Sequence, residues 1–260
     1  MTAAQESLIT AVALGGFGLI FGSFLNAVAY RLPRGQSPWD PKRSHCPSCG
    51  AEIRARDNVP VASWLILRGK CRDCGESISW RYPVFEALTA ALWAALGAYH
   101  GLEPELLPDL LLATTLLVVA NSDLDTRVIP NKLLFVSLLA GLVAQAWARP
   151  DQWLAWSVSS TAAFTGMFLI ALAYPRGMGM GDVKLAGVMG LYLGRAVAPA
   201  LLFAFLLGSL SGVVVMARKG IAEGRKTAVP FGPFLAVGGV FAVFWGEDAV
   251  EWYLDTFAGG

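Results

Sequence analysis

The sequence is poor in charge. Only 15% of its 260 residues are Asp, Glu, Lys or Arg, against roughly 25% in an ordinary soluble domain. Hydrophobic residues make up 55% of the chain, and its mean hydropathy is +0.55. One water-soluble core cannot bury so much apolar surface. The composition therefore excludes disorder and a solvated scaffold, and it points to the lipid bilayer.

The chain also has little net charge and few cysteines. Twenty Lys and Arg against nineteen Asp and Glu give +1, so no global charge attracts nucleic acid, and we expect no nucleic-acid partner. Four cysteines are too few for a disulfide framework in a chain of this length. Their role must be read from their spacing.

What the sequence does contain is long apolar runs. A helix needs about 20 apolar residues to cross the hydrocarbon, and the chain shows no alternation of period two that would suggest barrel strands. We therefore expect an all-α polytopic membrane protein with about eight transmembrane helices. The runs cover residues 8–30, 83–100, 106–122, 132–148, 153–174, 183–195, 197–217 and 229–247.

The sixth run is short. Gly194-Arg195 is either a tight turn between two helices or an irregularity within one longer re-entrant stretch. Lys and Arg in short flanking loops stay cytoplasmic. With eight spans and an external N-terminus, only Arg149 and Arg195 of the twenty positive residues fall outside. Merging runs six and seven would instead place the acidic C-terminal segment inside. The charge pattern favours eight spans, with the first run, residues 8–30, as a retained anchor.

The four cysteines lie in the long polar loop, residues 31–82, which we expect on the cytoplasmic side. They form two pairs, Cys46-x-x-Cys49 and Cys71-x-x-Cys74. Two such pairs can wrap one tetrahedral Zn²⁺ with four thiolates, and a site closed in this way is structural. A redox pair or unrelated cysteines are the alternatives. His45 adjoins the first pair and could compete as a ligand, although a surface histidine is favoured.

Acidic residues mark two helix ends on the same expected face. Asp123 and Asp125 close the third run, and Asp182 opens the sixth after glycines at 177, 179 and 181. Ionisable residues at membrane depth are costly and are functional candidates by default. The alternatives are an N-cap role for Asp182 and interfacial solvation for the other two.

Two carboxylates that share a proton can activate a water, because the ionised one acts as base while the neutral one donates to the scissile carbonyl. The glycines, among them Gly179 and Gly181, would let the backbone approach an extended peptide closely. Lys184 either favours the charged form of Asp182 or anchors the end of its helix at the membrane–water interface. For Glu86, at the start of the second run, snorkelling or a partner such as Arg81 is favoured over a substrate contact.

Taken in order along the chain, these motifs resemble those of the bifunctional type IV prepilin peptidases, which serve type IV pilus and type II secretion systems. The resemblance covers most of the chain. The segments that carry it are Gly22–Asn26, Tyr30–Pro33, both cysteine pairs, Asn58–Pro60 with Trp64, Arg81–Pro83 with Glu86–Thr89, and Gly179–Asp182.

The resemblance implies an aspartic endopeptidase of the bacterial inner membrane, with its catalytic face in the cytoplasm. The second catalytic aspartate closes the G-x-G-D motif, which is Asp182. Counting back from Ile129-Pro130 places the first at Asp123, with Asp125 as the alternative. The chain has Pro130-Asn131 where bifunctional members often have Pro-Asp, a departure that bears on substrate preference more than on catalysis.

The resemblance also implies the partners and the second activity. Its substrates are type IV prepilins or pilin-like precursors, cleaved between Gly and an aromatic residue ahead of an apolar helix. The new N-terminus is then methylated from S-adenosylmethionine. We expect three parts: residues 1–30 as the first helix, residues 31–82 as the zinc-binding, methyltransferase part, and residues 83–260 as the peptidase bundle.

Two other classes of function remain open from the residues alone. A transporter that relays protons would place its acids near the middle of spans and show broken, pseudo-symmetric helices. A membrane-anchored zinc-ribbon adaptor would leave Asp123 and Asp182 without a role. The position of the acids at helix ends favours the peptidase.

Overall fold

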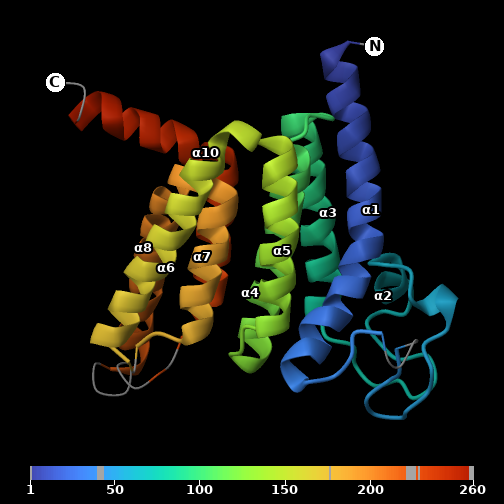
Figure 1. Ribbon diagram of the computed structural model, residues 1–260. Helices are drawn as coiled ribbons and strands as arrows, with labels where there is room; N and C mark the ends of the chain where they lie inside the picture. Colours follow the sequence, from blue (N-terminus) through green and yellow to red (C-terminus); the bar gives the residue numbers. More distant parts are fainter. Residues whose placement is uncertain (1, 40–43, 176, 221–226, 228, 258–260) are drawn as a thin grey trace. The chain divides into compact units, whose positions relative to one another are not determined.

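The computed structural model describes residues 2–39, 44–175, 177–220, 227 and 229–257. Within these residues every regular element is a helix, and β pairing is confined to two isolated bridges, His45 with Glu52 and Lys70 with Ser77. The chain forms two compact units, Met1–Leu106 and Leu107–Gly260 (Figure 1). The predicted all-α class is confirmed.

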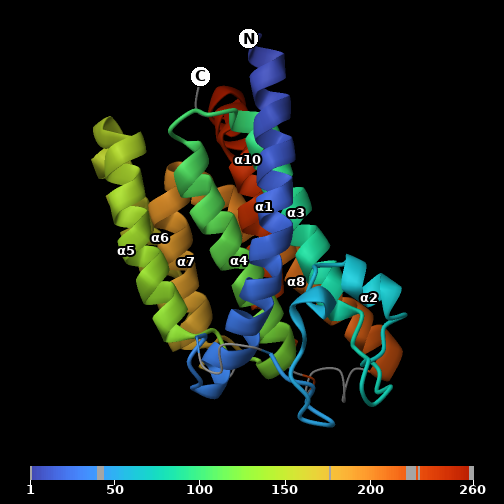
Figure 2. The ribbon, with the colours of Figure 1, turned by 90° about the vertical axis from the view of Figure 1, so that its right-hand side faces the viewer.

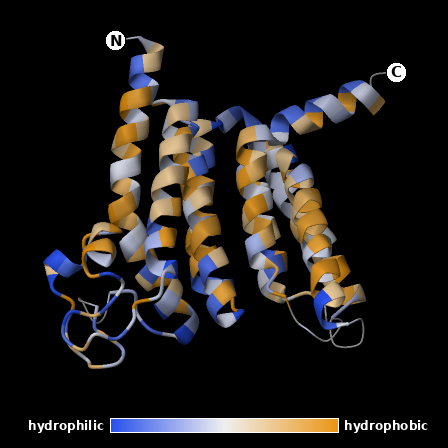
Figure 3. Cartoon of the chain, turned by 180° about the vertical axis from the view of Figure 1, so that it is seen from behind, coloured by the Kyte–Doolittle hydropathy of each residue, from blue (hydrophilic) through white to orange (hydrophobic). Residues whose placement is uncertain are grey.

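The first unit is a helix pair with a polar insertion. Helices α1 (Ala3–Arg31) and α3 (Arg81–His100) run antiparallel, because Gly18 lies against Ala90 and Gly97 against Ala11. Small residues let two membrane helices approach closely. The insertion contains the 3₁₀ turns η1 (Leu32–Arg34) and η2 (Ala55–Asp57) and the short helix α2 (Ala62–Ile66). It is largely hydrophilic, in contrast to the helix pair (Figure 3).

The second unit is a helix bundle. It contains α4 (Leu106–Thr126), α5 (Asn131–Ala148), η3 (Pro150–Gln152), α6 (Trp153–Ala173), α7 (Met180–Leu193), η4 (Gly194–Ala196), α8 (Val197–Lys219) and α10 (Gly232–Phe257). Helix α7 packs against α5, α6 and α10 (Figure 2), and every residue from Val183 to Leu193 except Lys184 is buried. The start of this central helix therefore lies within reach of several other elements.

The chain reverses between α7 and α8. Gly194 has a φ of 55°, a conformation that glycine adopts without strain. Helix α10 runs parallel to α7 and antiparallel to α8, so α7 and α8 are separate segments joined by a tight turn. The contacts that fix these directions pair Gly239 with Met189, Gly246 with Ala196, Gly238 with Ala200 and Gly208 with Phe231.

The number of spans is roughly consistent with the sequence. Within the described residues, six helical stretches are long and apolar enough to cross a membrane, and one of them, Met180–Lys219, contains both α7 and α8. Counting these two separately and adding α3 gives one helix for each of the eight apolar runs. The chain is a multi-pass membrane protein.

Helix α10 is longer than its apolar run, which ends at residue 247. It continues to Phe257, and its last turns bend away from the bundle (Figure 1). Arg195 in η4 pairs with Glu247 at 2.6 Å and with Glu251 at 3.1 Å. Hydropathy ends the run at the first acidic residue, but glutamate, present at 247 and 251, forms helix readily, so the backbone continues.

Candidate active site and metal centre

The first acidic candidate, Asp123, lies in the last turn of α4 and is 5% exposed. Arg127, the residue after the end of α4, has a φ of 55°, and its N–H donates to the Asp123 carbonyl at 2.9 Å. This is a left-handed C-terminal cap. The buried Ser122 hydroxyl donates to the Val128 carbonyl at 2.7 Å and fixes the turn that follows. The backbone that carries Asp123 is therefore firmly held.

Asp125 is exposed, whereas Asp123 is buried. Residues two apart on a helix point about 200° away from each other, so the two carboxylates cannot serve the same site. The burial favours Asp123, the position obtained by counting back from Ile129-Pro130.

The second candidate, Asp182, occupies the first turn of α7 and is 9% exposed. Its Oδ2 accepts a hydrogen bond from the Gly179 N–H at 3.1 Å. Gly179 is the N-cap residue, so Asp182 lies three positions further into the helix than the N-cap role considered from the sequence. A carboxylate here interacts favourably with the helix dipole.

The segment between α4 and α5 packs directly on the start of α7. A Cβ at Gly181 would lie 2.9 Å from the Ile129 Cβ, a separation that real Cβ atoms do not show. Glycine is therefore required at 181 for this contact. The packing brings the end of α4, with Asp123, beside the start of α7, with Asp182. Close approach of these glycines to a substrate stays a prediction.

Lys184 lies on the exposed side of α7, and its Nζ donates to Asn131 Oδ1 at 2.9 Å. This bond links α7 to the first residue of α5. It fits the anchoring role considered for Lys184.

Sequence reasoning missed one member of this site, Gly232 at the start of α10. Its N–H donates to Asp123 Oδ2 at 2.8 Å across 109 residues of sequence. A Cβ at 232 would lie 2.8 Å from the same oxygen and 3.0 Å from the Asp123 Cβ. The signal in the sequence was the Gly232-Pro233 pair, which commonly opens a helix.

We expect Gly232→Ala to lower the rate of peptide cleavage on the order of 100-fold, because we predict Asp123 to be catalytic and a displacement of about 1 Å at such a group has that effect. Gly212→Ala on α8 is the control, since a Cβ there meets no atom within 4 Å. Initial rates on a precursor peptide in detergent micelles measure both. Equal rates for the two variants would mean that the contact at Gly232 does not matter for activity.

The four cysteines gather at one point in the first unit. Their Sγ atoms all lie within 4.8 Å of one another, and Cys46 and Cys74 are 3.8 Å apart. Four sulfurs around one Zn²⁺ at 2.3 Å would be about 3.8 Å from each other in a tetrahedron. The donor set and its spacing fit zinc. His45 is not part of this group of described ligands.

Both cysteine pairs adopt the same turn. The Cys46 N–H donates to Ala51 and the Cys71 N–H to Glu76, at 2.9 and 2.7 Å, and each pair is followed by a glycine at positive φ, Gly50 and Gly75. Backbone N–H groups of Cys49 and Ser48 point at the Cys46 sulfur and lower the pKa of that thiol to about 7. The local backbone thus favours the thiolate, the form that binds metal.

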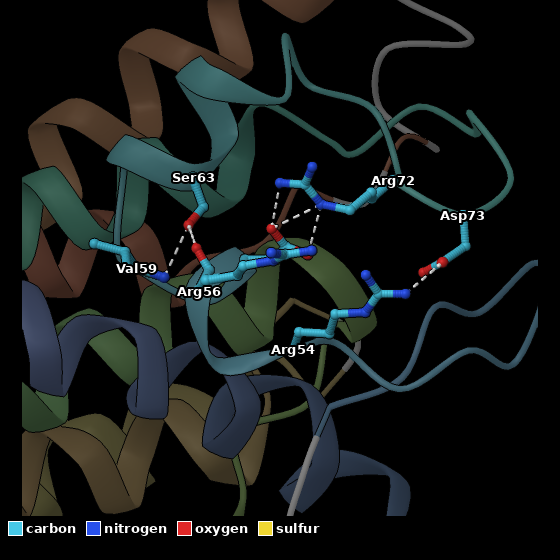
Figure 4. Close-up of polar contacts among 7 residues, drawn as sticks. Arg54, Arg56, Val59, Ser63, Arg72 and Asp73 are labelled. Atoms are coloured by element: carbon cyan, nitrogen blue, oxygen red, sulfur yellow. Dashed lines mark hydrogen bonds and ion pairs between the residues drawn. The ribbon is translucent and has the colours of Figure 1, made fainter.

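Two ion pairs connect the residues between Cys71 and Cys74 to Asp57 in η2 and to Arg54 just before η2 (Figure 4). Arg72 donates through Nε and Nη2 to both carboxylate oxygens of Asp57, with distances from 2.6 to 3.0 Å, and Arg54 pairs with Asp73 at 3.3 Å. The Arg72 hydrogen bonds lower the pKa of Asp57. We call these two contacts the clasp.

Asp57→Asn is expected to release zinc to a chelator roughly tenfold faster, as is common when a group supporting metal ligands is removed. Asp73→Asn should change the rate by less than about twofold, since the Asp73 side chain is 39% exposed and that of Asp57 only 9%. The lowered pKa keeps Asp57 ionised, so its contribution is present at neutral pH and is lost only as pH falls through that value. A colorimetric chelator assay gives the rates, and identical rates for both variants would contradict the assignment.

Comparison with known proteins covers both units. Residues 17–100 match the bacterial peptidase A24 N-terminal domain, and residues 110–217 match the type IV leader peptidase family. A prepilin leader peptidase/N-methyltransferase of Bacillus subtilis is 34% identical over 94% of this chain and 97% of its own length. Proteins of the same name from Pseudomonas aeruginosa and Legionella pneumophila are 34% and 33% identical, each over 93% of this chain and over 92% and 93% of their own lengths. No solved structure matches the chain.

Proposed function

The chain belongs to the prepilin leader peptidase/N-methyltransferase family, and from this membership we propose that Asp123 and Asp182 are its catalytic carboxylates. The observation that carries the assignment is their burial side by side at the junction of α4 and α7. The substrates we propose are type IV prepilins or pilin-like precursors, from which the enzyme removes the leader peptide.

The pair performs hydrolysis without a covalent intermediate. The ionised carboxylate takes a proton from water while the water oxygen bonds to the scissile carbonyl carbon, and the protonated carboxyl donates to the carbonyl oxygen. The C–N bond then breaks and the leaving amine receives a proton from the pair. The Gly232 and Gly179 N–H groups each hold one carboxylate in place.

The proposed sidedness follows the charge pattern. With the N-terminus outside the bacterial inner membrane, the ends of α4 and α7 that carry Asp123 and Asp182 lie at the cytoplasmic face. The leader of a precursor with its apolar helix in the bilayer would reach them there.

Methyl transfer is proposed for residues 31–82, and Zn²⁺ is proposed to bind Cys46, Cys49, Cys71 and Cys74 as a structural ion. The methyl donor proposed from the family is S-adenosylmethionine, whose sulfonium supplies the methyl group. Among the described residues of this loop, no glycine-rich turn opens a helix in the manner of common nucleotide sites. The described part of the loop therefore does not form a glycine-rich nucleotide-binding site, and the residues that bind S-adenosylmethionine are left unassigned.

Co-expression with a pilin-like precursor from the same genome tests both activities. The expected result is a mature protein shortened by its leader and heavier by one methyl group, with the new N-terminus aromatic. An unprocessed precursor beside an inserted, monodisperse enzyme would contradict the peptidase proposal. A cleaved but unmethylated product would contradict the methyltransferase part alone.

A further inference from the structure

One buried carboxylate is not used in the proposed peptidase mechanism. Glu86 lies in the second turn of α3, in the first unit, and is 8% exposed. Its Oε2 accepts a hydrogen bond from the Val61 N–H at 2.7 Å. The sequence favoured snorkelling or a pairing with Arg81, but the carboxylate instead binds the backbone just before α2. An ionisable group on a membrane helix needs a functional explanation.

The backbone that Glu86 binds is strained. Val61 has a φ of 60° and a ψ of −52°, and the Ala62 N–H donates to the Pro60 carbonyl at 2.5 Å. This three-residue turn is a γ-turn of the rare kind with positive φ, and for a β-branched residue it is an outlier. Such a conformation persists only where the surroundings hold it, and here the Glu86 carboxylate does so.

The same turn is tied to the rest of the polar insertion. The Ser63 hydroxyl accepts from the Val59 N–H at 2.9 Å and donates to the Arg56 carbonyl at 3.0 Å (Figure 4). Arg56 and Asp57 both belong to η2. The ion pair between Asp57 and Arg72, which is part of the clasp, connects η2 to the second cysteine pair. A continuous set of contacts therefore runs from Glu86 on α3 through the γ-turn to the metal centre.

The part of α3 that carries Glu86 is packed closely against α1. A Cβ on Gly22 of α1 would lie 3.0 Å from the Glu86 Cα, so the two helices touch at this level. Asn26 of α1, which is buried, donates to the Tyr82 carbonyl at 3.2 Å one turn before Glu86. The backbone that carries Glu86 is therefore held by the packing of α1 against α3.

We propose that Glu86 is a positioning residue for methyl transfer: by accepting the Val61 N–H it holds the strained turn, and through it the cysteine module, on α3. This inference rests on the proposed methyltransferase role of residues 31–82. The proposed catalytic carboxylates belong to the other unit, and we expect cleavage to be independent of Glu86.

The first test compares Glu86→Ala with Glu86→Gln. Glu86→Ala lowers methylation on the order of 10- to 100-fold, the usual effect of misplacing a site by about 1 Å. Its cleavage rate and zinc content stay at the wild-type level, and hydrogen exchange rises in the peptide that covers residues 58–66. Glu86→Gln keeps a carbonyl oxygen that accepts the same N–H, and it methylates like the wild type. Glu103→Ala, at an exposed glutamate of the same unit, is the matched control.

The second test relieves the strain directly. Glycine adopts a positive φ without penalty, so Val61→Gly forms the turn without help from Glu86. Adding Val61→Gly to Glu86→Ala therefore restores methylation and the protection of residues 58–66. This double variant also separates loss of the turn from general misfolding of the Glu86→Ala protein.

Three results would overturn the inference. Normal methylation by Glu86→Ala would remove the positioning role, and so would equal loss in Glu86→Gln, which would show that the charge and not the acceptor matters. Failure of the double variant to recover would show that the turn is not the route. Absence of methylation in the wild type, with normal cleavage, would instead refute the proposed methyltransferase function.

Discussion

Asp123→Asn and Asp182→Asn are each expected to abolish leader cleavage, with rates lowered on the order of 10⁴-fold or more, as found when a member of a catalytic unit is removed. Each variant replaces a carboxylate by an amide of nearly the same shape that neither takes up nor releases the proton that hydrolysis requires. The double variant should be no worse than either single one, because the two groups act together.

Asp125→Asn is the matched control, since it makes the same chemical change two residues away on the exposed side of α4. It should retain cleavage within about threefold. Rates come from mass spectrometry of a precursor peptide, with insertion and monodispersity checked for every variant. If Asp125→Asn were inactive while Asp123→Asn cleaved normally, the placement of the first catalytic aspartate would be wrong by two positions.

The second large effect concerns the metal. Replacing Cys46 and Cys49 with Ser should release about one zinc ion per chain and unfold much of the polar insertion, because a loop of some fifty residues has too small a core to fold alone. Methylation should fall at least on the order of 100-fold, whereas cleavage should change little, since acid and base in the proposed pair need no metal. Ser48→Ala, inside the same cysteine pair, is the control.

The two products are counted separately in one reaction that contains a precursor peptide and an isotopically labelled methyl donor. Zinc is measured on the same samples by elemental analysis. An equal loss of cleaved and methylated product in protein that is still inserted would show that the insertion also builds the peptidase site. The proposed division between the two parts of the chain would then fail.

The broad architecture was predictable because its signals are local. A membrane helix must satisfy its own backbone hydrogen bonds and present apolar side chains over a fixed length, so composition alone located the runs that became α1, α3 to α8 and α10. The bounds differ at the last helix, where hydropathy stopped at residue 247 and the structure continues to Phe257.

The cluster of four cysteines was likewise predictable from the sequence. The spacing Cys-x-x-Cys forces two sulfurs to one side of a tight turn, and both pairs do so with the same backbone hydrogen bonds. The cysteine spacing could not predict the clasp. The loop contains many charged residues, and nothing in the sequence indicates that Asp57 pairs with Arg72. Only the folded turn decides that Asp57 is shielded and Asp73 is not.

The sequence by itself determined the class of protein, the eight apolar helices, the cluster of four cysteines and Asp182 as a candidate carboxylate. Each of these rests on residues close together in the chain. The tertiary structure decided which of Asp123 and Asp125 is buried, brought the Gly232 N–H to Asp123 across 109 residues, and joined Glu86 to a strained turn at Val61. These pairings depend on how separate helices pack, since a hydrogen bond between distant residues leaves no periodicity or spacing to read.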